Sequence, residues 1–229
     1  MLFLYLGKMA LSWLMVFEHI LYGVCFICGI ITSASVTVSQ GEFAGQCILY
    51  GTVKCNSSVG ECTATSFSNV SLCYFVCGVS VFVSLYCFAV VLHRIYTIFI
   101  GETTRESVWM NFYFACCGIF VFFLLICSCI LQVGFDKLCT SILENKEIKS
   151  CSDAQQKSWA TPYKGSLFYT NIYSAKSADW VNFFLWIVIL GLLIVQKRKE
   201  SEFRPLSASD PEWSTAENEP IVSSKSRQS

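Results

Sequence analysis

Few residues in this chain could carry chemistry. Cys25 and Cys28 have the spacing of a redox dithiol, but they lie inside a long apolar run and not at a strand-to-helix turn, so packing is the favoured role. The two histidines, His19 and His93, are too few for common zinc or catalytic-triad arrangements. No Walker A, Gly-x-Ser-x-Gly or His-Glu-x-x-His sequence occurs. We therefore expect a protein that is not an enzyme and that binds no cofactor or metal.

Glu18 and His19 are ionisable residues within the first apolar run, where such residues are costly and often functional. If a helix begins at Trp13, its rise of 1.5 Å per residue places Glu18 roughly 7 Å inside the membrane edge. At that depth, a partner at the interface or on another helix, such as Arg94, is the favoured interpretation. A proton or ion path is the alternative.

The composition indicates a membrane protein. Of the 229 residues, 54% are hydrophobic and 14% are charged, and 16 Lys and Arg balance 16 Asp and Glu. Several apolar runs exceed about 18 residues, which is the length typical of membrane spans. Nucleic-acid binding requires clustered basic residues that this neutral chain lacks, so we expect no nucleic-acid partner.

Four apolar runs are long enough to cross a hydrocarbon core of about 30 Å as helices. They predict an all-α membrane protein, a four-helix bundle, with spans at 13–34, 72–92, 108–133 and 180–196. Stripes of small residues at helical spacing should mediate close contacts between the helices in lipid. Each stripe is a row of small residues along one face of a predicted helix. The stripes are Cys25, Gly29 and Thr32 in the first span, Cys77, Ser80, Ser84 and Cys87 in the second, and Asn111, Ala115 and Gly118 in the third.

Basic residues near the span ends predict that both termini are cytosolic. Segments 1–12, 93–107 and 197–229 would lie in the cytosol, and 35–71 and 134–179 outside it. The six Lys of 134–179 weaken this assignment, so cysteines and sequons must decide it. The Ser- and Pro-rich tail, 197–229, is expected to be disordered. A cleaved signal peptide ending near Ser33 is the alternative for the N-terminus, but the apolar run is too long for one.

Cysteines outside the spans occur only in the two segments assigned to the outside, which fits three disulfides in an oxidising compartment. In the first outer loop, Cys47, Cys55 and Cys62, together with Cys73 at the outer start of the second span, allow three pairings, of which we favour Cys47 with Cys73 and Cys55 with Cys62. Cys139 and Cys151 in the second outer loop have only each other. Both glycosylation sequons, at Asn56 and Asn69, also lie in the first outer loop, and Asn56 is the better candidate because Asn69 adjoins the second span.

The outer loops also carry structural signals. Val36–Ser39 alternates and 48–53 is β-prone, so the first outer loop is expected to contain short antiparallel strands braced by disulfides. The second outer loop is rich in aromatic residues, which either supply contacts for a partner or pack over the bundle. These candidates for an interaction surface are Trp159, Tyr163, Phe168, Tyr169 and Tyr173.

Several segments together resemble the transmembrane protein 179 family, in its B-type branch. They are Met9–Leu14, Gln40–Gly51, Ser71–Phe75, Trp180–Asn182, Arg204–Leu206 and Asp210–Ser214. The resemblance covers nearly the whole chain and implies a claudin-like four-helix architecture without an assigned activity. It also implies that Cys47, Cys73, Cys139 and Cys151 are the family's outer cysteines, and that Cys55 and Cys62 are an additional pair. The first outer loop has no Trp, a departure from the claudin pattern, so a paracellular-pore function is not carried over.

The sequence therefore predicts a multipass protein of the plasma membrane or of secretory or endosomal membranes. Its expected function is that of an interaction, adhesion or accessory protein, whose partners are the lipid bilayer and other membrane proteins or further copies of itself. The alternative is a small channel or transporter subunit. That alternative requires a polar path through the bundle, for which Glu18, His19, Asn111 and Asn182 are the notable candidates.

Overall fold

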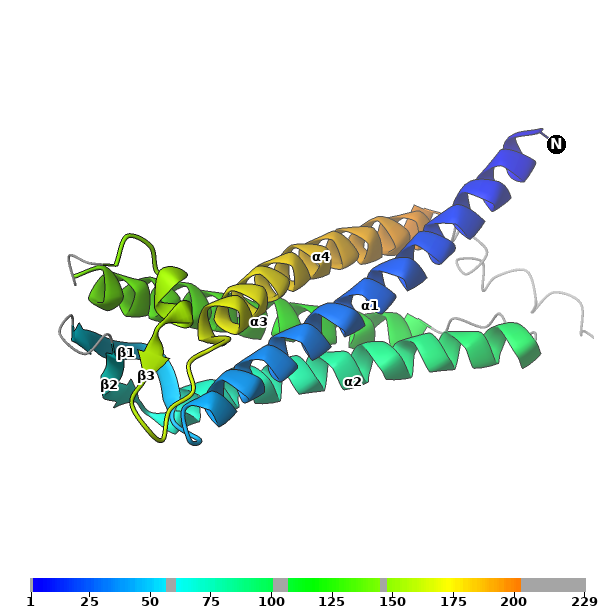
Figure 1. Ribbon diagram of the computed structural model, residues 1–229. Coiled ribbons are helices and arrows are strands. Elements are labelled where there is room, and N and C mark those ends of the chain that lie inside the picture. The colour runs from blue at the N-terminus through cyan, green and yellow to red at the C-terminus, as the bar shows by residue number, and fades with distance from the viewer. Residues whose placement is uncertain (1, 57–60, 101–106, 145–147, 203–229) are drawn as a thin grey trace, which may run out of the picture. The chain divides into compact units, whose positions relative to one another are not determined.

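The computed structural model describes residues 2–56, 61–100, 107–144 and 148–202. The elements are α1 (Leu2–Glu42), β1 (Cys47–Asn56), β2 (Glu61–Ser68), α2 (Val70–Ile100), α3 (Ser107–Leu143), the 3-10 helix η1 (Asp153–Gln156), β3 (Ser158–Trp159) and α4 (Phe168–Glu202). The chain divides into two compact units, one up to Leu193 and the other from Ile194. Within the first unit, the strands lie together at the end of the bundle where α1 ends and α2 begins (Figure 1). This end is called the sheet end below.

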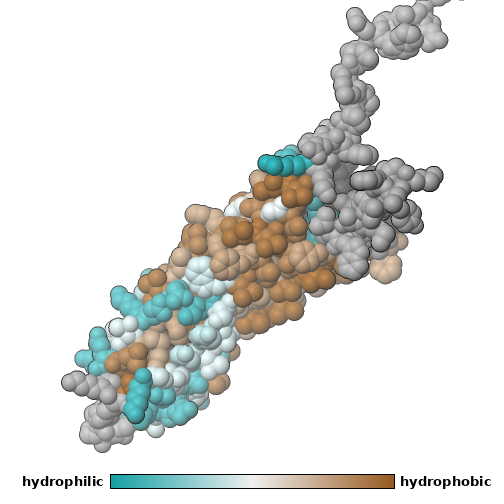
Figure 2. Space-filling view, turned by 90° about the horizontal axis from the view of Figure 1, so that it is seen from above, coloured by the Kyte–Doolittle hydropathy of each residue, from teal (hydrophilic) through white to brown (hydrophobic). Residues whose placement is uncertain are grey.

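Each of the four long helices contains a segment that is long and apolar enough to cross a membrane, which confirms the four-helix fold class. These segments are Val16–Glu42, Val70–Thr97, Asn111–Leu143 and Phe168–Arg198. Apolar surface lies along the helices in Figure 2, and polar residues gather toward the sheet end.

The helices are longer than the apolar runs suggest. Residues 134–143 belong to α3 and 168–179 belong to α4, although both ranges were assigned to the second outer loop. Residues 197–202 are likewise helical and not disordered, and the rest of the expected disordered tail lies outside the described residues. The ends of the predicted spans were set by hydropathy. A helix, however, continues as long as one of its faces is packed, so it can extend beyond the apolar run.

The buried face of α4 alternates steps of four and three residues, the period of left-handed, coiled-coil-like packing. The residues of this face are Phe168, Ile172, Ala175, Asp179, Asn182, Trp186, Ile189 and Leu193.

The expected stripes of α1 and α2 do face the interior: Cys25, Gly29 and Thr32 are buried, as are Ser80, Ser84 and Cys87, while Cys77 is half-buried. The stripe expected in α3 is wrong, because Asn111, Ala115 and Gly118 are exposed. α3 instead turns the face with Cys117, Leu124 and Leu131 inward.

The first outer loop forms the expected antiparallel hairpin of β1 and β2, and β3 adds to β2 in parallel. The prediction of a strand over 48–53 is confirmed, but Val36–Ser39 belongs to α1 and the strand predicted there is wrong. Four alternating residues are too short a pattern to distinguish a strand from a helix. α1 ends where Gly45, at φ +82°, donates its N–H to the carbonyl oxygen of Gln40 at 2.8 Å, a glycine helix cap.

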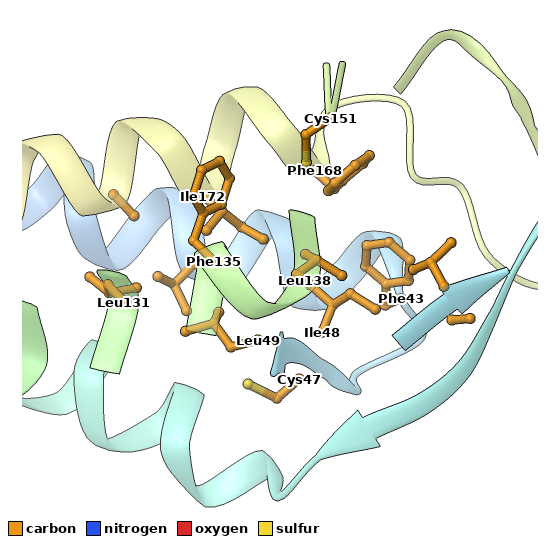
Figure 3. Packing of buried hydrophobic residues seen from close by; sticks show 14 of the residues in the cluster. Phe43, Cys47, Ile48, Leu49, Leu131, Phe135, Leu138, Cys151, Phe168 and Ile172 are labelled. Atoms are coloured by element: carbon orange, nitrogen blue, oxygen red, sulfur yellow. The ribbon is translucent and has the colours of Figure 1, made fainter. Parts of the chain in front are cut away.

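Two apolar clusters fill the first unit. The one at the sheet end, called the sheet-end core, joins α1, β1, α3 and α4 through side chains that include Phe43, Ile48, Leu138 and Phe168 (Figure 3). β1 lies directly on α3, since a β-carbon added at Gly134 would lie 2.9 Å from Cε2 of Tyr50. The second cluster, called the bundle core, lies between the helices and contains Leu21, Tyr22, Cys25, Val83, Cys87, Val90, Cys117, Leu124, Trp186, Ile189 and Leu193.

Candidate functional site

Three disulfides fasten the sheet end. Cys47–Cys73 joins the start of β1 to the first turn of α2, Cys55–Cys62 links the paired strands β1 and β2, and Cys139–Cys151 ties α3 to the segment before η1. For the first outer loop, this is the favoured one of the three possible pairings. Cys47, Cys62 and Cys73 belong to the sheet-end core, so these bonds fix buried backbone and not a loose loop.

The start of α4 is held by the end of α1. The Glu42 carboxylate accepts hydrogen bonds from the Leu167 backbone N–H at 3.0 Å and from the Ser166 hydroxyl at 3.1 Å. A carboxylate beside a helix N-terminus satisfies free backbone donors and favours the helix dipole. The sheet, the end of α1 and the start of α4 are therefore one fixed structure.

Most of the aromatic residues of the second outer loop are packed against the core, which is the second of the two roles considered for them. Phe168 is fully buried, and Trp159 and Tyr163 pack partly buried against the sheet-end core. The Trp159 ring lies 5.3 Å from that of Phe43 and 5.4 Å from that of Phe168, and its Nε1 donates to the Ala154 carbonyl at 3.1 Å. The reason is that β3 and the start of α4 close over the hairpin, so these rings cover the core.

Tyr169 and Tyr173 behave differently. Tyr173 is 50% exposed, and its ring stacks on that of Tyr169 at 6.0 Å between centroids. Phe135 of α3 braces both tyrosines, and the Lys176 ammonium lies 4.6 Å from the centre of the Phe135 ring. We call Phe135, Tyr169, Tyr173 and Lys176 the tyrosine patch. It combines ordered aromatic surface with a positive charge, a composition typical of protein-binding anchors.

Glu18 lies at the other end of the bundle and is buried. Its Oε1 is 3.9 Å from Nη2 of Arg94, the partner that the sequence suggested, and Arg94 is partly exposed. His19, beside it, is half-buried. Buried carboxylates are normally paired, because an isolated charge in an apolar medium is costly. The pair joins α1 to α2 and accounts for a charged residue within the apolar run.

A second buried acid, Asp179, lies in the segment that hydropathy assigns to the second outer loop. Asp179 is fully buried in α4, where its Oδ2 accepts a 2.7 Å hydrogen bond from the Ser128 hydroxyl of α3. Asn182, one turn further along the buried face of α4, is also fully buried. The spacing in the sequence could have identified Asp179, because Asp179 lies three residues before Asn182, which lies four residues before Trp186. The predicted span begins only at residue 180 and therefore leaves Asp179 out.

The remaining candidates are distributed over several elements. Asn69 is exposed and caps α2, since its Oδ1 accepts the Ser71 N–H at 3.0 Å, and the side chain of Asn56 lies outside the described residues. Cys25 and Cys28 are free thiols inside the bundle, and Asn111 lies at its surface. Within the described ranges, no group of three His, Cys, Asp or Glu side chains is placed to hold a metal ion.

Four helices able to span a membrane, with a disulfide-braced sheet after the first, define a claudin-like multipass membrane protein. Residues 14–222 match the family model described as Transmembrane protein 179/179B Claudin domain, and the chain belongs to this family. It is 48% identical to Transmembrane protein 179B of Danio rerio over 96% of this chain and 100% of the relative. For the Homo sapiens protein of that name, the identity is 39% over 95% of this chain and 98% of the relative. No solved structure is significantly similar to the chain.

Proposed function

We propose that this protein is a non-enzymatic interaction or accessory protein that binds another membrane protein through its sheet end. The observation that carries this proposal is the tyrosine patch on the braced frame of α3 and α4. Stacking fixes Tyr169 and Tyr173 before a partner arrives, so binding requires little further ordering of these side chains. A partner with an aromatic or carboxylate group would complement the exposed ring and the ammonium.

The test is co-purification of the tagged full-length protein in mild detergent from cells that naturally express it. A variant with Tyr173→Ser and Lys176→Ser removes the exposed ring and the charge but leaves the sheet-end core intact. Tyr74→Ser is the matched control, because Tyr74 is an exposed tyrosine near the start of α2, whereas the patch residues belong to α3 and α4. We expect a stoichiometric partner that is lost only in the double variant. Equal recovery from all three proteins would contradict the proposal.

The proposed orientation places the sheet end outside the cytosol, with both termini cytosolic, in the plasma membrane or in secretory or endosomal membranes. Disulfides and sequons at the sheet end support it, since both features belong to oxidising compartments. Asn56→Gln should abolish a glycosidase-sensitive increase in mass, whereas Asn69→Gln should leave it, because Asn69 is engaged in capping beside the membrane. A protein without any glycan whose tail is cleaved by protease added outside sealed cells would have the opposite orientation.

A small channel or transporter subunit is the second candidate. The buried Glu18, Asp179 and Asn182 favour it, since ionisable groups inside membrane bundles often mark ion paths. Against it, the bundle core fills the interior between Glu18 and Asp179 with closely packed apolar side chains, including Val83, Leu124 and Trp186. This apolar packing favours the accessory role over a channel or transporter. Ion flux in reconstituted vesicles that disappears with Glu18→Gln would reverse this preference.

A further inference from the structure

A group of buried polar side chains lies where the two apolar clusters adjoin. It contains Thr32 from α1, Ser80 from α2, Ser128 from α3, and Asp179 and Asn182 from α4, all fully buried. We call these five residues the polar layer. Ser128 contacts Asp179 directly, and the Thr32 hydroxyl lies 3.5 Å from the carbonyl oxygen of Ala175, one turn before Asp179. Gly29, close to Thr32 on α1, lies against the Ser80 carbonyl. All four helices therefore supply the layer.

The hydroxyl protons of the layer are already used. Thr32 donates to the Cys28 carbonyl at 3.0 Å, Ser80 donates to the Val76 carbonyl at 2.8 Å, and Ser128 donates to Asp179. A hydroxyl oxygen has two lone pairs and a carboxylate has several, so each of these groups can still accept. Oδ1 of Asp179 and both polar side-chain atoms of Asn182, Oδ1 and Nδ2, have no hydrogen-bond partner among the described residues. The layer thus has an excess of acceptor oxygens.

Asp179 also brings an uncompensated charge. Within the described part of the chain, no Lys or Arg lies within ion-pair distance of its carboxylate, while Glu18 at the other end has Arg94. An ionised carboxylate buried without a cation is unstable in an apolar medium, so it must gain either a proton or a cation. Carboxylate, amide and hydroxyl oxygens are hard ligands that bind hard cations.

We propose that the polar layer binds one monovalent cation of the size of sodium. Oδ1 of Asp179 and the amide oxygen of Asn182 are the protein ligands, and Ser128 holds the carboxylate in position through Oδ2. Water completes the coordination and accepts the Asn182 amide N–H. A cation here would neutralise Asp179 while the Ser128 hydrogen bond keeps the carboxylate attached to α3, which adds stability to the bundle. The proposal does not depend on a protein partner at the tyrosine patch.

The test measures radioactive sodium bound to the purified full-length protein in lipid nanodiscs, with choline as the ion that replaces sodium. We expect about one sodium per chain, with saturation. Unlabelled sodium should displace it and choline should not. Because a ligand that binds only the folded state stabilises it by mass action, the melting temperature should rise by about 3–6 °C when choline is replaced by sodium at roughly tenfold its dissociation constant.

Asp179→Asn is the principal variant, because it removes the charge and keeps the shape of the side chain. It should fold and lose both sodium retention and the sodium-dependent rise. Glu18→Gln is the matched control and should keep both, since it removes the other buried acid of the bundle. Asn182→Ala should weaken sodium binding about tenfold, through the loss of one ligand.

Two results would overturn the proposal. One is a wild-type protein that retains no more sodium than Asp179→Asn and melts at the same temperature in sodium and choline, in which case Asp179 carries a proton. The other is sodium binding that survives in a folded Asp179→Asn variant, whether or not Glu18→Gln also keeps it. The comparison of ions on the wild-type protein needs no variant, so it decides the question even if Asp179→Asn does not fold.

Discussion

A β-carbon added to Gly29 of α1 would lie 2.9 Å from the carbonyl oxygen of Ser80 on α2, closer than real β-carbons approach other heavy atoms. The two helices therefore meet with backbone against backbone. Ser84 strengthens the same contact, since its hydroxyl lies 3.4 Å from the carbonyl oxygen of Phe26. In lipid, where hydrophobic burial does not drive helices together, such close contacts are a main source of association.

Gly29→Ala should therefore destabilise the bundle by about 1–3 kcal/mol, the cost of overpacking a close contact. Gly23→Ala is the matched control on the same helix, because a β-carbon there would meet no atom within 4 Å. At Gly23, alanine should leave stability unchanged or raise it by up to about 1 kcal/mol through its better helix propensity. Unfolding in mixed micelles by denaturant titration measures both. Equal effects at the two positions would show that α1 and α2 are not this close.

The Glu18–Arg94 pair predicts an asymmetry. Arg94→Gln leaves Glu18 buried without this cation and should cost about 3–5 kcal/mol of stability. Glu18→Gln should cost less, because the partly exposed Arg94 side chain can extend toward the membrane surface. The double variant should regain part of the loss from Arg94→Gln. A double-mutant cycle on unfolding free energy measures this coupling, and strictly additive effects would mean that the pair contributes nothing.

The four helices and the small-residue stripes of α1 and α2 could be predicted because each depends on local pattern, whereas the cysteine pairing of the first outer loop was a choice among three. The length of an apolar run identifies a membrane helix. Small residues such as Gly29, Ser80 and Ser84 can be recognised as possible contact positions without knowing where the neighbouring helix lies. The stripe of Asn111, Ala115 and Gly118 looked equally suitable and is exposed. Spacing identifies a face of small residues, but only the positions of the other helices decide which face of α3 is covered.

The candidate site was less predictable, for two physical reasons. Lys176 and Asp179 lie just before the apolar run, and their charges excluded this part of α4 from the predicted span. A helix nevertheless stays packed when only one of its faces is apolar. Trp159 and Tyr173 are both aromatic residues of one outer segment, yet one faces the core and the other faces out. That difference arises from the path of the chain over the hairpin, which residue types do not specify.

The disulfides of the first outer loop should differ in importance. The loop-entropy relation assigns about 3.5 kcal/mol to a bond that closes a separation of 26 residues, as Cys47–Cys73 does, and about 2.4 kcal/mol to one of 7 residues, as in Cys55–Cys62. Cys47 and Cys73 are also both buried in the sheet-end core, so serine at these positions would place hydroxyls in an apolar region.

We therefore expect Cys47→Ser with Cys73→Ser to reduce the folded yield strongly, and Cys55→Ser with Cys62→Ser to leave a folded protein with a lower melting temperature. The two double variants are expressed in the same cells. Their amounts at the cell surface and the thermal unfolding of the purified proteins are then compared. A larger loss from the hairpin pair would show that Cys55–Cys62, and not the anchor of β1 to α2, determines the stability of the sheet end.

The aromatic residues of the second outer segment should separate into packing and contact groups. Trp159→Ala removes a ring that contacts Phe43 and Phe168 and a hydrogen bond to the Ala154 carbonyl, so it should cost about 3–5 kcal/mol of stability. Tyr173→Ala removes a half-exposed ring and should cost less than about 1 kcal/mol. Denaturant titration of the two variants measures the difference. If Trp159→Ala unfolded no more easily than Tyr173→Ala, the Trp159 ring would not be part of the core, and it would return to the set of candidate contact residues.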